Sequence, residues 1–142
     1  MSPQLVKILI AGVLLLHGLG HGGAIGALIA IDRGVPSGKW LAARSWLFPR
    51  LNPRVAELIA IILWTLSLVG FISAALSFWG VLIPGDLWRT VALVSSFISF
   101  IGITLFWGTW PMFNTLAAQA VNLAVMVTQL WLYWPALDMF GK

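Results

Sequence analysis

The run LVKILIAGVLLLHGLGHGGAIGALIAI, from Leu5 to Ile31, decides the fold of this chain. Apart from Lys7 and two histidines, every residue in the run is apolar or glycine. A helix over this run would be about 40 Å long at 1.5 Å per residue, which exceeds the roughly 30 Å of hydrocarbon in a bilayer. The run therefore predicts a first membrane-spanning helix.

Three further apolar runs reach the length of about 20 residues that a spanning helix needs. The four expected spans cover residues 5–31, 55–79, 87–107 and 112–134. Asn52 followed by Pro53 predicts a helix start, because Asn caps a helix and Pro is favoured at its first position. The short connections after the second and third spans predict antiparallel neighbours. We therefore expect an all-α integral membrane protein, a four-helix up-down bundle with one domain over residues 1–142.

The composition of the 142-residue chain supports this class. Hydrophobic residues make up 61% of it and charged residues only 8%, whereas a soluble domain carries about 25% charged residues. The chain has no cysteine, which excludes disulfides, thiolate catalysis and cysteine-ligated metals. The net charge of +4 is small and does not favour nucleic acid as a partner.

Basic residues predict the orientation in the membrane. Five of the eight lie in or beside the loop over residues 32–54, namely Arg33, Lys39, Arg44, Arg50 and Arg54. Because basic loops stay in the cytoplasm, we expect this loop inside and both termini outside. The apolar, uncharged turn between the third and fourth spans and the lack of a visible soluble domain favour a bacterial plasma membrane. The alternating stretch KWLAARSWLF in the loop predicts a short helix along the membrane interface.

Tryptophan positions predict an aromatic belt at the span ends. Trp64, inside the second span, is the exception. The expected belt residues are Trp79, Trp88, Trp107, Trp110, Trp131 and Trp134.

Glycines in the first span predict close helix packing. Gly18, Gly22 and Gly26 recur every four residues, and small residues at this spacing let membrane helices approach one another. Helix contact is thus the simplest interpretation of the stripe.

Polar residues inside the spans predict a buried cluster. His17 and His21 share one helix face near the middle of the bilayer. Gln119 and Asn122 on the fourth span and Ser99 on the third reach similar depths. Polar groups at this depth need partners. The cluster can hold the helices in register, line a ligand pocket or ligate a cofactor.

Glu57 is the acidic residue within a span, in the second turn of its helix. An ion pair with a neighbouring basic residue such as Arg54 would stabilise it there. Alternatively, His17, His21 and Glu57 are candidates for a metal site with two histidines and one carboxylate, although Glu57 lies about one turn away in depth. A divalent metal, or one axial histidine to a haem or pigment, stays open as the cofactor. No nucleophile, base and acid set is visible, which disfavours an enzyme.

The motifs LLHGLGHGGAIG and AELIAIILWTLSLVGFISAAL resemble those of DoxX-like small four-helix membrane proteins. The resemblance covers the first half of the chain. It matches His17, Gly18 and Glu57 to the His-Gly pair and the glutamate of that group, with His21 in place of a basic residue.

Two functions follow. The first is a non-enzymatic binding or accessory subunit that contacts membrane lipids, a quinone-like ligand, other membrane subunits or further copies of itself. The second is a haem-, pigment- or metal-binding membrane protein that uses His17 and His21.

Overall fold

The computed structural model describes residues 1–136 and residue 139, and the helices begin where the sequence supplies a cap or a proline. Helix α1 (Pro3–Asp32) follows Ser2, whose side chain accepts a hydrogen bond from the amide of Leu5 at 3.3 Å. Helix α2 (Pro53–Ser77) follows Asn52, which caps the amide of Arg54 at 3.0 Å. These capped starts confirm the predicted helix start at Asn52.

Two shorter helices complete the bundle. Helix α3 (Trp88–Leu105) matches the third predicted span to within two residues at each end. Helix α4 (Met112–Leu130) ends four residues before the expected Trp134. Trp134 precedes Pro135, a position disfavoured in a helix, and Tyr133 has a positive φ of 48°, outside the right-handed helical region. The side chain of Gln129 instead donates a hydrogen bond to the carbonyl of Trp134.

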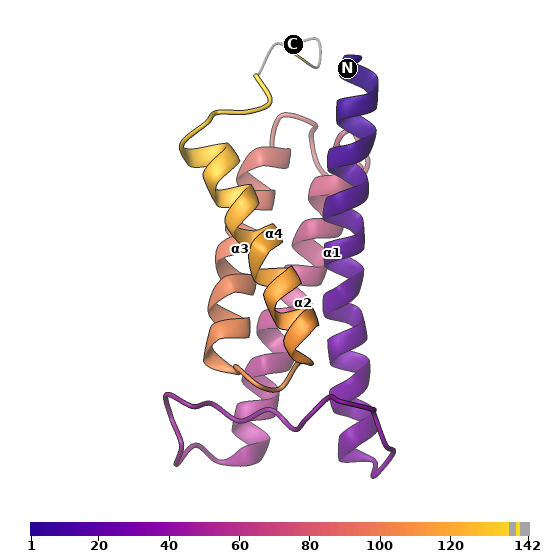
Figure 1. Ribbon diagram of the computed structural model, residues 1–142. Coiled ribbons are helices and arrows are strands. Elements are labelled where there is room, and N and C mark those ends of the chain that lie inside the picture. The colour runs from indigo at the N-terminus through magenta and orange to yellow at the C-terminus, as the bar shows by residue number, and fades with distance from the viewer. Residues whose placement is uncertain (137–138, 140–142) are drawn as a thin grey trace.

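The described residues form no strand, and the prediction of an all-α up-down bundle is confirmed (Figure 1). Helices α1, α2 and α3 are each long and apolar enough to cross a membrane. Helix α4, the fourth expected span, is not among the helices that are apolar enough by composition alone. It is about 28 Å long, and its polar side chains Thr115, Gln119 and Asn122 are buried whereas Leu116 and Leu123 are exposed. This inward polar face is the arrangement that a surrounding lipid phase favours.

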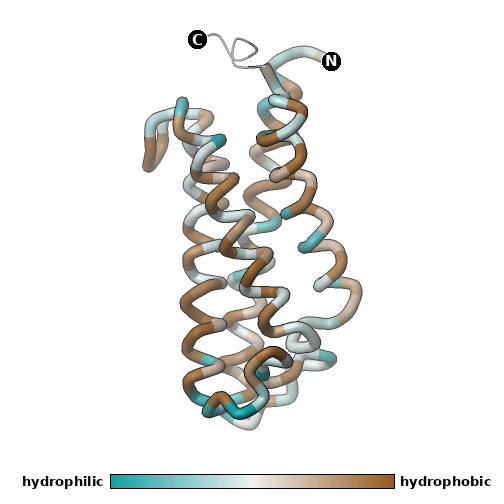
Figure 2. Tube along the Cα trace, turned by 90° about the vertical axis from the view of Figure 1, so that its left-hand side faces the viewer, coloured by the Kyte–Doolittle hydropathy of each residue, from teal (hydrophilic) through white to brown (hydrophobic). Residues whose placement is uncertain are grey.

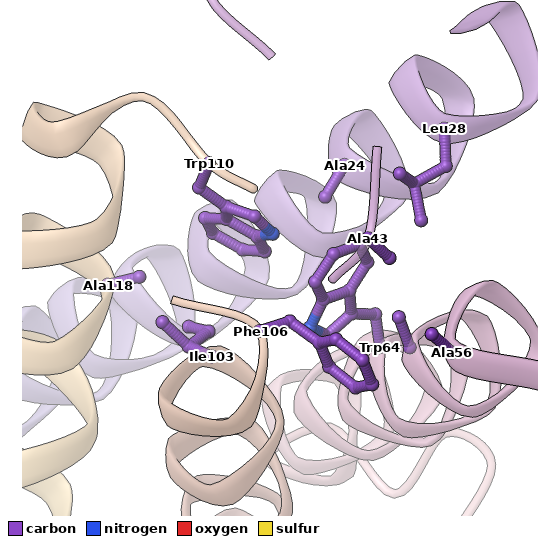
Figure 3. Close-up of a cluster of buried hydrophobic side chains, with 10 residues drawn as sticks. Ala24, Leu28, Ala43, Ala56, Trp64, Ile103, Phe106, Trp110 and Ala118 are labelled. Atoms are coloured by element: carbon purple, nitrogen blue, oxygen red, sulfur yellow. The ribbon is translucent and has the colours of Figure 1, made fainter. Parts of the chain in front are cut away.

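Large hydrophobic side chains are exposed on all four helices, and hydrophobic residues predominate along the helical part of the chain (Figure 2). Hydrophilic residues gather at the end that carries the loop between α1 and α2, residues 33–52, which we call the 1–2 loop. The N-terminus and the end of α4 lie at the opposite end (Figure 1). Two apolar clusters form the core. One, with Trp64, Phe106 and Trp110, lies at the loop end (Figure 3), and the other, with Leu14 and Phe71, lies towards the termini.

The prediction of a short interfacial helix in the 1–2 loop is wrong. The stretch over residues 39–48 contains no helix. It crosses the end of the bundle, where the amide of Leu41 donates to the carbonyl of Thr109 at 2.9 Å and the indole of Trp46 donates to the carbonyl of Thr104 at 2.6 Å. Ala43 and Ser45 are buried between exposed neighbours. Burial thus alternates with a period of two, which suits an extended segment rather than a helix.

The aromatic belt is also only partly correct. Trp79 and Trp131 are exposed, as are Trp107 and Trp134, in keeping with positions at a membrane interface. Trp88 and Trp110, by contrast, are 5% and 6% exposed and belong to the two core clusters.

Candidate functional site

Polar side chains from three helices meet in the middle of the bundle. The imidazole Nε2 of His17 lies 2.9 Å from Oδ1 of Asn122. The Nδ2 amide of Asn122 donates to Oγ of Ser99 at 2.8 Å, and this oxygen lies 2.9 Å from Nε2 of His21. His21, Ser99 and Asn122 are fully buried. The four side chains therefore join α1, α3 and α4 at one level.

Gln119 extends the network towards the loop end. Nδ2 of Asn122 also donates to Oε1 of Gln119 at 3.1 Å. Nε2 of Gln119 in turn donates to Oγ1 of Thr104 at 3.0 Å and to the carbonyl of Phe100 at 3.3 Å. We call the set His17, His21, Ser99, Thr104, Gln119 and Asn122 the polar network. The structure thus brings together five of the six side chains that the sequence singled out as a ligand or polar cluster.

Helix periodicity explains how these residues reach one another. His17 and His21 are four apart on α1, and Gln119 and Asn122 are three apart on α4, so each pair shares a face. The three serines of α3 differ in their hydrogen-bond partners. Ser95 and Ser96 donate to carbonyls four residues earlier in their own helix, at 2.7 and 2.9 Å, whereas Ser99 faces the network.

Two aromatic rings pack against the imidazoles of the network. The ring of Phe71, from α2, lies 4.5 Å from that of His17 and 6.1 Å from that of His21. The ring of Trp110 lies 5.2 Å from that of His21. The Nδ1 atom of His21 is buried there without a hydrogen-bond partner. The imidazoles therefore lie in a mostly apolar surrounding, and their polar partners come from α3 and α4.

Glu57 lies apart from the histidines. It lines a hollow of about 200 Å³ at the loop end, together with Asp32, Arg44 and Arg54. Within the described part of the chain, no group of three His, Cys, Asp or Glu residues is placed to hold a metal ion. The structure therefore does not bring Glu57 together with His17 and His21, because Glu57 lies near the start of α2 at the loop end of the bundle.

The glycine stripe makes contact over part of its length. A Cβ atom at Gly18 would lie 3.1 Å from Cβ of Phe71 and 3.3 Å from the carbonyl of Leu68, so α1 and α2 touch there. A Cβ at Gly22 would be at an ordinary 3.7 Å from Leu68. The prediction of a helix contact is wrong at Gly26, since a Cβ atom there would meet nothing within 4 Å. Gly26 is exposed, whereas Ala24 and Leu28 on either side of it are buried in a cluster that includes Trp64 of α2, so Gly26 lies off the contacting face of α1.

Helices α1 and α4 leave a gap between them in the bundle. Backbone packing follows chain order, α1 on α2, α2 on α3 and α3 on α4, whereas α1 and α4 are not packed closely together. Among the hydrogen bonds of the described residues, the one from His17 to Asn122 is the single link between α1 and α4. The gap is therefore bridged near its middle by one hydrogen bond.

Two grooves occupy this gap. The loop-side groove has a volume of about 360 Å³ and is lined by residues that include Val13, Leu16, His17, Gly20, Phe113, Asn114, Ala117 and Val121. The terminal-side groove has a volume of about 290 Å³ and is lined by residues that include Leu9, Val13, Trp88, Val121, Val125 and Trp134. Because Val13 and Val121 line both, the grooves adjoin. His17 is the imidazole that faces the loop-side groove, and it is only partly buried.

Three contributors to the site were not predicted. Thr104 lies five residues after Ser99, a spacing that does not keep one helix face. From the sequence alone, Phe71 is indistinguishable from any other core residue of the second span, and Trp110 was expected in the aromatic belt. The position of Trp110 could have been inferred from Pro111. Pro111 is the N-cap of α4 and so fixes Trp110 in the short connection between α3 and α4.

Comparison with known proteins finds no matching family model, no matching curated protein and no matching solved structure. The resemblance of His17, Gly18 and Glu57 to DoxX-like proteins stays a prediction.

Proposed function

We propose that this chain is a non-enzymatic membrane protein that binds an apolar, membrane-soluble molecule of the quinone or quinol class between α1 and α4. The observation that carries the proposal is the open gap between these helices, with an imidazole facing a groove of otherwise mostly apolar lining. Ligand pockets combine apolar walls with a few polar groups that orient the ligand, and the loop-side groove has this composition.

Depth distinguishes such a molecule from a phospholipid. His17 is 14 residues from Pro3 and 15 residues from Asp32, so it lies about 21 Å from either end of α1. A phospholipid keeps its polar head at the membrane surface, about 15 Å from the bilayer middle. Its acyl chains can enter the groove, but they offer no hydrogen bond to His17. A molecule with a small polar ring on an apolar tail can form such a hydrogen bond at this depth.

The proposed orientation of the chain in the membrane rests on the basic loop. Arg44 and Arg50 line a hollow of about 490 Å³ at the loop end. Anionic lipids attract such residues at the cytoplasmic face, which favours a cytoplasmic loop and external termini. The groove would then open towards the cytoplasmic half of the bilayer.

The test uses two glycines of α1 as a matched pair. A side chain at Gly20 or at Gly23 would meet nothing within 4 Å, but only Gly20 of the two lines the loop-side groove. We expect Gly20→Leu to fill the groove without straining the helix. Gly23→Leu adds the same side chain to a lipid-facing position.

Binding is measured with a decyl-substituted benzoquinol and benzoquinone on the purified chain in nanodiscs, as the rise in thermal unfolding temperature with ligand concentration. The wild type and Gly23→Leu should be stabilised, and Gly20→Leu should not. Equal stabilisation of all three proteins, or of none, would refute the proposal. If Gly20→Leu instead changed the oligomeric state, the occupant of the groove would be a second copy of the chain.

A further inference from the structure

The polar network has a fixed hydrogen-bond polarity that begins at a backbone group. The carbonyl of Phe100 can only accept, so the amide nitrogen of Gln119, 3.3 Å away, must face it. The carbonyl oxygen of Gln119 is then left to accept from Nδ2 of Asn122 at 3.1 Å. This sets the orientation of the Asn122 amide, whose oxygen Oδ1 points at Nε2 of His17.

The polarity continues into the imidazole of His17. Oδ1 of Asn122 is an acceptor, so Nε2 of His17 must carry the hydrogen. A neutral imidazole has one donor and one acceptor nitrogen. Nδ1 of His17 therefore carries a lone pair, and it has no hydrogen-bond partner among the described residues. The residue that lines the loop-side groove thus offers an acceptor.

His21 takes the opposite form. Oγ of Ser99 accepts from Asn122, and its remaining neighbour in the network is Nε2 of His21. If the Ser99 hydroxyl donates to Nε2, only Nδ1–H of His21 is left unpartnered. If His21 donates instead, both the Ser99 hydrogen and Nδ1 of His21 are left unpartnered. The first arrangement leaves fewer buried polar groups unsatisfied and is favoured.

We infer that the groove selects a ligand whose head donates a hydroxyl hydrogen to Nδ1 of His17, which is the phenol or quinol class rather than the quinone class. This inference rests on the proposed function, because it concerns the ligand of the same groove. A quinone carbonyl placed at Nδ1 would set two acceptors against each other. A quinol hydroxyl completes the chain of hydrogen bonds that begins at Phe100.

Three probes with the same decyl tail test this selection under anaerobic conditions. They are the benzoquinol, the benzoquinone and the dimethyl ether of the quinol, which lacks a donor. One net hydrogen bond corresponds to a preference of about three- to tenfold. We expect the quinol to bind more tightly than both other probes by about this factor. In His17→Phe, which keeps a ring but no nitrogen, the three affinities should become equal.

The outcomes separate the inference from the proposed function. If all three probes bind the wild type equally and Gly20→Leu abolishes their binding, the groove is real and the hydroxyl selection is wrong. Tighter binding of the quinone would overturn the selection in the same way. If no probe binds, the proposed function fails first.

Nitrogen NMR of the wild type tests the polarity without any variant. The chain has two histidines, and ¹⁵N-labelled imidazoles report which nitrogen carries the hydrogen. We expect one Nε2–H ring and one Nδ1–H ring, with the quinol shifting the unprotonated Nδ1 of the first. Two rings of the same tautomer, or a shift of the other ring, would overturn the inference even if His17→Phe did not fold.

Discussion

Removal of the Asn122 side chain tests whether the polar network holds the bundle together. Asn122 is fully buried and makes three hydrogen bonds, to His17 at 2.9 Å, Ser99 at 2.8 Å and Gln119 at 3.1 Å. Two of these bonds, to His17 on α1 and to Ser99 on α3, are interhelical. Interhelical hydrogen bonds in membrane proteins contribute about 0.6 kcal/mol each on average, so the two together contribute about 1 kcal/mol. The polar atoms left without a partner add to the loss, at about 1–3 kcal/mol for a group that stays buried.

We therefore expect Asn122→Ala to lower the free energy of unfolding by about 2–4 kcal/mol. The assay is reversible unfolding in mixed micelles, followed by circular dichroism. Asn114→Ala is the matched control, because Asn114 lies on the same helix, is exposed and forms no hydrogen bond within the described chain. A change within about 0.5 kcal/mol is expected for it.

A double-mutant cycle separates the network from the cavity that alanine leaves. Ser99→Ala and Asn122→Ala should be non-additive by at least about 0.5 kcal/mol, since their side chains are in contact. Ser96→Ala should add to Asn122→Ala, because the Ser96 hydroxyl bonds the carbonyl of Ala92 in its own helix. Additivity of both pairs, or an Asn122→Ala effect no larger than that of Asn114→Ala, would refute the reasoning.

Three further changes probe the frame around the network. Gly18→Ala should destabilise by about 1–3 kcal/mol through overpacking against α2, while Gly12→Ala, with nothing within 4 Å, should be neutral or stabilising, as read from unfolding curves. Asn52→Ala should cost about 1 kcal/mol in the same assay through loss of the α2 cap, and no loss would contradict the capping geometry. Trp46→Phe removes the bond to the Thr104 carbonyl, so amide exchange at Leu41 should become faster, and unchanged exchange would show that the loop is held otherwise.

The polar network was largely predictable because polar side chains are scarce in the spans. Each must find a partner in the absence of water, and residue rise places His17 and Asn122 at the same depth. Ser99 was named correctly, but the sequence alone does not show why Ser95 and Ser96 take no part in the network. Ser95, Ser96 and Ser99 are equally polar, but a serine in a helix can also bond the carbonyl four residues earlier. Only the rotation of α3 in the bundle decides between these options.

The loop and the grooves were not predictable for a related reason. Hydrophobic periodicity gives the inward face of a helix, but it does not give the angle at which two helices cross. Helix α4 crosses the front of the bundle obliquely, and it packs on α3 rather than on α1 (Figure 1). The gap that results is a property of the whole assembly. The 1–2 loop, likewise, follows the end of the bundle that it covers, and its own sequence pattern suggested a helix instead.

The bridge across the gap links binding to stability. His17 holds α1 to α4 through Asn122 and also lines the loop-side groove. A ligand that bonds Nδ1 of His17 would stabilise the folded bundle according to its concentration relative to its Kd. Because neighbouring hydrogen bonds polarise one another, the same ligand would also strengthen the bond from Nε2 to Asn122. The variant Asn122→Ala should then bind the quinol less tightly than the wild type, although Asn122 itself does not line the groove.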